Sequence, residues 1–157
     1  MLDKRDVRIF ASLRSAGRIK LTDLSRETGL PVSTIFDRMK SSAAIQRHAT
    51  LLDFHMLGFG VKAIVLLKAA KDYREALHDH LMYHFHINNL SKVNNGFDYC
   101  MECVFHTMQE LEEFLESLEE KYRIKQKTVY YVVKDLKREA FMSDPLTCEY
   151  LLNNDKI

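Results

Sequence analysis

Apolar residues recur at helical spacing in the first forty residues of the chain. Over residues 2–13 they fall roughly at helical spacing, at Leu2, Val7, Ile9, Phe10 and Leu13, which favours an amphipathic helix. Asp3 stands just ahead of this stripe and is the expected cap, because its carboxylate accepts hydrogen bonds from free backbone N–H groups. A second, shorter stripe follows, with Thr22 as its expected cap and Gly29 at its end. The pattern predicts two successive helices.

A third helix is predicted after Pro31, since proline sets the backbone for a helix start. Its apolar residues Val32, Ile35 and Met39 share one side and are expected to pack on the first two helices. The other side begins small and polar and becomes cationic, which suits close approach to base edges and phosphates. The predicted DNA-facing residues are Ser33, Thr34, Asp37, Arg38 and Lys40. The alternative is a solvated outer face on an ordinary core helix.

Helix, helix, tight turn and helix is the helix-turn-helix order. Residues 45–52 then alternate partly between polar and apolar, which predicts a short strand and so a winged form of the motif. Arg47 would lie near the backbone of a bound duplex. A plain connecting strand has the same pattern. Residues 1–50 are therefore predicted to form a winged helix-turn-helix domain.

Residues 51–141 predict a second domain in which strands and helices alternate. The predicted strands are residues 61–69, 87–94, 97–105 and 127–136, and the predicted helices are 72–85 and 108–122. Thr107 is the expected cap of the second of these helices. The resulting order, β-α-β-β-α-β, is the ferredoxin-like pattern, so the fold class is α+β. Residues 142–157 form a C-terminal tail, either a short helix or a frayed end.

Charge divides the chain in the same way. Residues 1–50 hold ten Lys/Arg and five Asp/Glu, whereas residues 51–157 hold thirteen and seventeen. The basic first part suggests an anionic partner. Apolar residues make up 46% of the chain, yet none of its apolar runs reaches the ~18 residues of a membrane span. We expect no signal peptide and no membrane association, and three cysteines fit a reducing cytoplasm.

Two clusters resemble metal or redox sites. His80 and His84 are four residues apart on a predicted helix, but no carboxylate or cysteine is placed in sequence to complete a metal site, though Asp79 and His106 exist. Cys100 and Cys103 form a CxxC, but on a strand residues three apart face opposite sides. We therefore predict no metal, no cofactor and no catalytic residue, and we interpret the cysteines as reduced packing residues.

The stretch LDKRDVRIFASLRSAGRIKLTDLSRETGLPVSTIFDRMK resembles the DNA-binding domain of the Lrp/AsnC family of prokaryotic transcription regulators, the leucine-responsive or feast/famine regulators. The matching positions include Leu2, Asp3, Asp6, Ile9, Leu13, Arg18, Leu21, Leu24, Gly29, Leu30, Ser33, Thr34 and Arg38. Pro31 stands where the family often has serine, and the segment after Met39 is shorter than usual. With the βαββαβ half, the resemblance covers roughly residues 2–140.

The resemblance implies sequence-specific binding to double-stranded DNA as a homodimer, with further assembly of dimers through the second domain. It also places an effector site, suited to an amino acid, at the turn between the second and third strands. Backbone N–H groups there would hold the carboxylate and Asp98 the α-ammonium. The expected site residues are Asn95, Gly96, Phe97 and Asp98. Here that turn is one residue shorter than the family's, and a plain hairpin is the alternative.

A second function fits the same two-part fold. Some proteins of this architecture are enzymes that decarboxylate sirohaem, and they need a tetrapyrrole pocket with histidines. This chain has seven histidines. The polar and cationic third helix and the basic first domain favour the regulator.

Overall fold

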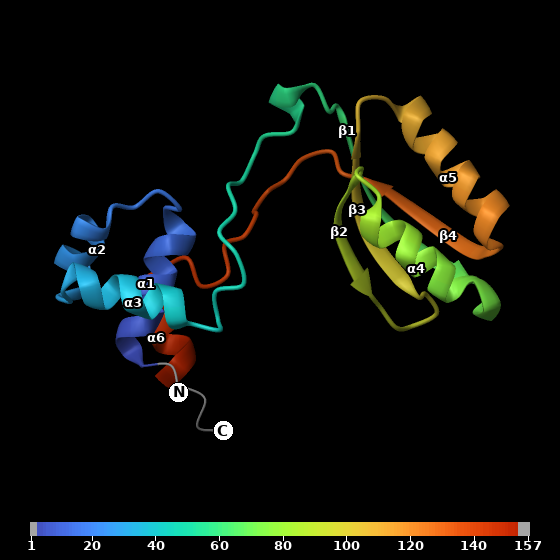
Figure 1. Cartoon of the computed structure of the whole chain (residues 1–157). Coiled ribbons are helices and arrows are strands. Elements are labelled where there is room, and N and C mark those ends of the chain that lie inside the picture. The colour runs from blue at the N-terminus through green and yellow to red at the C-terminus, as the bar shows by residue number, and fades with distance from the viewer. Residues whose placement is uncertain (1–2, 154–157) are drawn as a thin grey trace. The chain divides into compact units, whose positions relative to one another are not determined.

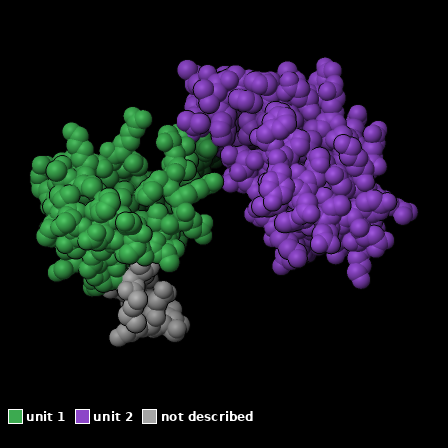
Figure 2. Space-filling model, viewed as in Figure 1, with its two compact units in different colours: residues 1–51, 136–157 green, residues 52–135 purple. Residues whose placement is uncertain are grey.

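The computed structural model describes residues 3–153 of the 157-residue chain. The chain forms two compact units (Figure 2), and each is described by itself. Unit 1 comprises residues 1–51 together with 136–157, and unit 2 comprises residues 52–135. Residues 136–141, which the sequence assigned to the second domain, therefore belong with the first helices. The chain crosses between the units twice.

Unit 1 contains the predicted helix-turn-helix (Figure 1). Its helices are α1 (Lys4–Ser15), α2 (Leu21–Thr28) and α3 (Val32–Ser41). The cap of α1 is confirmed: the Asp3 carboxylate accepts from two backbone N–H groups, and Asp6 accepts from the N–H of Asp3. Gly29 ends α2 with φ of 70°, a left-handed conformation that glycine adopts without strain. A small core of Ile9, Leu24, Leu30 and Ile35 holds the helices together.

Three local expectations in unit 1 are wrong. Thr22 does not cap α2, because the helix already begins at Leu21 and Lys20 precedes it without a side-chain cap. Val32 lies at the exposed start of α3 and not in the core. Residues 45–52 contain no strand, since they pair with no other strand of the sheet and a strand needs such a partner.

The C-terminal tail forms a helix, α6 (Pro145–Asn153), which packs against α1. A second small core joins them and contains Val7, Ala11 and Cys148. Arg14 of α1 donates hydrogen bonds to the backbone oxygens of residues 141 and 139, at 2.6 and 3.0 Å. The tail is therefore an integral part of unit 1.

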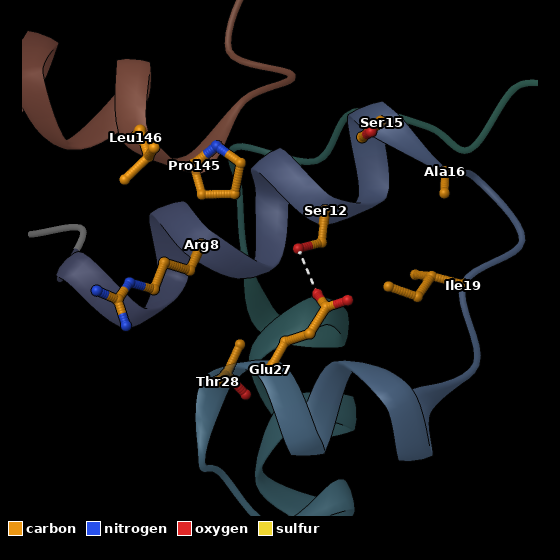
Figure 3. Close-up of a pocket in the computed structure, with 9 residues that line it drawn as sticks. All are labelled: Arg8, Ser12, Ser15, Ala16, Ile19, Glu27, Thr28, Pro145 and Leu146. Atoms are coloured by element: carbon orange, nitrogen blue, oxygen red, sulfur yellow. Dashed lines mark hydrogen bonds between the residues drawn. The ribbon is translucent and has the colours of Figure 1, made fainter.

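A cavity of about 450 Å³ lies beside α1, α2 and the start of α6 (Figure 3). Across it the Ser12 hydroxyl donates a 3.1 Å hydrogen bond to Glu27, which ties α1 to α2. Pro145 and Leu146 come from α6 on the other side of α1. Ser12 is itself buried, so this bond also satisfies a polar group inside the helical core.

Unit 2 has the predicted βαββαβ order. Its strands are β1 (Val61–Ala69), β2 (Ile87–Lys92), β3 (Tyr99–Phe105) and β4 (Ile124–Tyr131), and its α-helices are α4 (Arg74–Tyr83) and α5 (Met108–Tyr122). Single 3₁₀ turns occur at His55–Leu57 and Lys71–Tyr73. The strands form one antiparallel sheet in the order β2-β3-β1-β4, with both helices on one face (Figure 1).

The element bounds differ from the predicted ones for a structural reason. The last strand was expected over 127–136, but β4 pairs with β1 from Ile124 opposite Ala69 to Tyr131 opposite Ala63. Because β1 begins at Val61, later residues have little strand left to pair with. The cap by Thr107 is confirmed, since its hydroxyl accepts from the backbone N–H of Glu110.

The sheet buries one face and leaves the other open. Ala63, Val65 and Leu67 of β1 face the helices and are fully or almost fully buried, whereas Ile64 between them is 37% exposed. The same alternation places Cys103 in the core and Cys100 on the open side, as predicted for a strand. Burial raises the pKa of Cys103 to about 12, so this thiol stays protonated.

Candidate DNA-binding and effector sites

The exposed face of α3 is defined by four residues, Ser33, Phe36, Asp37 and Lys40, all of which are exposed. Their spacing of three, four and seven positions places them on one side of a helix. The opposite side carries Ile35 and packs against α1 and α2. Three predicted DNA-facing residues therefore lie where expected, and α3 presents a mixed polar, aromatic and cationic surface.

Arg38 does not point outward with them. Its Nη1 donates to Asp6 at 2.6 Å and to Asp3 at 2.8 Å, and its side chain is 30% exposed. The hydrogen bonds that the guanidinium donates to both carboxylates raise the pKa of Arg38, and they in turn lower the pKa of Asp3. The expected outward position was wrong because the capping acids of α1 attract the guanidinium. In this structure Arg38 fixes α3 against the start of α1.

Phe36 was missed by the sequence reasoning, although its side chain is 53% exposed. The signal was present: an aromatic residue lay beside the inner stripe of Ile35 and Met39 but was not part of it. Phenylalanine on a groove-binding helix offers an apolar surface to the methyl group of thymine. Thr34 is partly buried at the edge of this face.

Arg47 lies on the segment between the units and is exposed. The structure has no wing strand to carry it. His48 is exposed beside it. The contact of Arg47 with the backbone of a bound duplex stays a prediction.

The β2–β3 connection is a tight turn with left-handed residues at Asn95 (φ 58°) and Gly96 (φ 95°). Both are exposed, and Phe97 is partly buried after them. Positive φ at two successive positions is typical of a tight hairpin turn, and Asn and Gly are the residues that tolerate it best. The turn therefore has the geometry that both the effector site and the plain hairpin require.

Asp98 has other partners than the expected ammonium group. One carboxylate oxygen accepts from the Ala69 N–H at 3.0 Å, and the other lies 3.0 Å from the Arg74 guanidinium. Tyr99 donates its hydroxyl to the carbonyl of Arg74 at 3.1 Å. Asp98 thus anchors the turn to the end of β1 and the start of α4. Both oxygens thus have partners within the protein, and the pairing of Asp98 with an α-ammonium stays a prediction.

Comparison with known proteins identifies the class. A family model described as winged helix-turn-helix DNA-binding matches residues 2–41. The regulator FL11 of Pyrococcus abyssi is 26% identical over 118 residues, covering 73% of this chain and 78% of that protein. FL11 of Pyrococcus furiosus is 25% identical over 119 residues, covering 74% and 79%. Both are named HTH-type transcriptional regulators.

Solved structures share the two-part fold. The regulator NMB0573 from Neisseria meningitidis, crystallised with L-Met, superposes with a TM-score of 0.79 at 22% identity, covering 88% of this chain and 94% of that one. AsnC of Escherichia coli gives 0.75 at 18% identity, covering 88% and 96%. LrpC of Bacillus subtilis gives 0.78 at 17% identity, covering 87% and 98%.

The chain therefore matches a winged helix-turn-helix DNA-binding domain over residues 2–41, is similar to HTH-type transcriptional regulators, and shares the two-part fold of the solved Lrp/AsnC-type regulators. Among the residues described, it has no helix long and apolar enough to cross a membrane.

Three of the histidines, His80, His84 and His86, form an aromatic cluster. The rings of His80 and His84 are 5.4 Å apart between centroids, and His84 also lies 4.4 Å from Phe114. No group of three metal-ligating side chains occurs within residues 3–153. Burial, helped by the neighbouring His80 and His86, lowers the pKa of His84 to about 4. His84 is thus a neutral packing residue near pH 7.

Proposed function

We propose that this regulator binds double-stranded DNA through the exposed face of α3, acting in the cytoplasm as a homodimer or an assembly of dimers. The observation that carries the proposal is the division of α3 itself. Ile35 is fully buried while Ser33, Asp37 and Lys40, with Phe36 between them, are turned to solvent. Packing of α3 against α1 and α2 does not require an aromatic ring on the solvent side of the helix.

The DNA-binding residues take different roles in this proposal. Ser33, Asp37 and Phe36 approach base edges, and Thr34 flanks them near the start of the helix. Lys40 and Arg47 neutralise phosphates. Arg38 positions α3 through Asp3 and Asp6, which sets the angle at which the helix enters the groove. In this role Arg38 affects DNA binding without contacting a base itself.

Dimerisation is proposed to cover the open face of the sheet. Ile64 of β1 pairs with Tyr130 of β4, and both are exposed on that face, with Leu66 partly exposed beside them. The sheet of a second copy would pack on this apolar face and remove it from water. A twofold dimer also presents two α3 helices, as a palindromic operator requires.

The β2–β3 turn is the proposed amino-acid site. Support comes from NMB0573, which was crystallised with L-Met, and from the positive φ angles at Asn95 and Gly96. These angles turn backbone N–H groups to one side, where they can bind a carboxylate. Phe97 would contact the effector side chain. Asp98 holds Arg74 beside the turn, so it contributes by positioning rather than by direct ammonium binding.

The test is selection of genomic fragments by the full-length protein, followed by footprinting of those retained. We expect protected half-sites with centres one helical turn apart, about 34–36 Å, or a multiple of that. Retention of fragments without a common protected motif would refute sequence-specific binding. The relatives and solved structures named above are described as transcriptional regulators. Mixing the protein with a tetrapyrrole and recording its visible spectrum tests the enzymatic alternative, which predicts a bound-state absorption band.

A further inference from the structure

A second cavity in unit 2 has the features of a separate ligand site. It measures about 400 Å³, within the ~300–1,000 Å³ usual for small-molecule sites. Its lining residues are Phe54, Phe59, Phe85, His86, Ile87, Asn88, Val104, His106 and Glu110. The cavity lies at the start of β2 and the end of β3. The β2–β3 turn lies at the other end of β3, about 20 Å away by strand length.

Two histidines in this cavity are held in fixed orientation and tautomer. Nδ1 of His86 lies 2.7 Å from the carbonyl oxygen of Val104, and Nδ1 of His106 lies 3.0 Å from that of Gly58. A carbonyl oxygen only accepts, so both rings must donate from Nδ1. Their Nε2 atoms are therefore hydrogen-bond acceptors when the rings are neutral.

Stacking holds the same rings in place. His106 stacks on Phe59 at 4.1 Å between centroids, and His86 stacks on Phe105 at 4.0 Å. Phe85 packs on His86 as well, with ring centroids 4.4 Å apart. The side chain of Phe85 is 87% exposed, so it forms a solvent-facing aromatic rim. Rings held in this way can accept a flat molecule without first being ordered.

The charge of the cavity restricts what it would bind. Its nine lining residues include one carboxylate, Glu110, and neither lysine nor arginine. One oxygen of Glu110 accepts from the backbone N–H of His106 at 3.0 Å, which orients the carboxylate and leaves its other oxygen available. A ligand with a carboxylate or phosphate would find no cationic side chain here. An ammonium group would find Glu110 and the faces of phenylalanine rings.

We propose that this cavity binds a protonated aromatic amine, with its ring between the phenylalanines and its ammonium at Glu110 and the histidine Nε2 atoms. This site is independent of the amino-acid site proposed at the β2–β3 turn. The cavity also selects a positively charged group, whereas an amino acid carries a carboxylate, for which the cavity has no cationic side chain.

The test is calorimetric titration of the full-length protein with tryptamine and with indole-3-propionate. These probes share an indole ring and differ in charge. We expect saturable binding of tryptamine at least tenfold tighter than that of indole-3-propionate. Equal or tighter binding of indole-3-propionate, or no saturation by tryptamine, would overturn the proposal.

Matched variants locate the site. Glu110→Gln keeps an oxygen that can accept from His106 and is expected to fold, yet to bind tryptamine at least tenfold more weakly. Glu116→Gln, at an exposed position of the same helix, is expected to bind it as the wild type does. Equal affinities in the two variants would place the amine elsewhere.

The aromatic rim is tested in the same way. Phe85→Leu is expected to weaken tryptamine binding severalfold, while Tyr83→Leu, which is 88% exposed outside the cavity, leaves it unchanged. Unchanged binding in Phe85→Leu would contradict the rim. The DNA affinity of Glu110→Gln without amine is expected to equal that of the wild type, so failure here is distinguishable from failure of the proposed function.

Discussion

Replacing Ile35 with alanine is expected to destabilise unit 1 without touching the DNA-facing surface. Ile35 is fully buried and packs with Ile9, Leu24 and Leu30 in a small core. Truncating a buried isoleucine to alanine costs about 2–5 kcal/mol through lost burial and the cavity left behind. Because so small a core has few neighbouring side chains that can move into the cavity, we expect a loss of unfolding free energy in the upper part of that range.

The matched control is Lys40→Ala, five residues further along the same helix. Lys40 is exposed, and a surface substitution of this kind changes stability by about 0.5 kcal/mol or less. For a domain of roughly 60–100 residues, each kcal/mol moves the melting midpoint by about 4–8 °C. At about 4–5 kcal/mol, Ile35→Ala is therefore expected to lower the midpoint of unit 1 by roughly 16–40 °C, and Lys40→Ala by only a few degrees.

The assay combines thermal denaturation with DNA affinity measured by fluorescence anisotropy. At a temperature where Ile35→Ala remains folded, its DNA affinity is expected to match the wild type, whereas Lys40→Ala binds more weakly at every temperature. The reasoning fails if Lys40→Ala melts early while retaining full affinity. It also fails if folded Ile35→Ala has lost DNA binding, because the side of α3 that carries Ile35 would then be the one that contacts DNA.

Three further predictions concern residues held by long-range contacts. Arg38→Ala is expected to lower the melting midpoint more than Lys40→Ala does; an unchanged midpoint with loss of base preference would return Arg38 to the DNA-reading face. The folded-state pKa of His84, about 4, lies below the ~6.5 of an unfolded histidine, so the unfolded state binds the proton first and stability falls as pH drops from about 6.5 to 4. Melting curves at pH 7 and pH 5 check this, and His84→Gln is expected to reduce the difference between the two melting midpoints. An equal difference in the variant would show that another group causes the pH dependence. Ile64→Asp is expected to give monomers in light scattering, and a dimer that survives would move the interface off the open sheet face.

The sequence predicted the elements whose signal is local. The apolar stripes of α1 and α5 recur at helical spacing, and Asp3 and Thr107 stand one residue before these helices as caps. The βαββαβ order followed from the same periodicities. Such patterns depend on neighbours within a few positions, so they are visible in the chain itself.

The misplaced features depend on partners far along the chain. The carboxylates that hold Arg38 lie 35 and 32 residues before it, and the N–H that engages Asp98 lies 29 residues before it. Helical spacing placed Arg38 beside Thr34 but could not show which partner the long side chain would reach. The strand expected over 45–52 had partial alternation but no strand to pair with, and alternation alone does not supply one.

The most direct test of DNA binding through α3 is the salt dependence of affinity for the protein's own upstream region. Each phosphate contact contributes about −0.9 to the slope of log K against log salt concentration. We expect a steep slope for the wild type and, for Lys40→Ala, a slope shallower by about 0.9 for each half-site bound. An affinity that does not change with salt, or identical slopes for the two proteins, would contradict the assignment of this helix face to DNA.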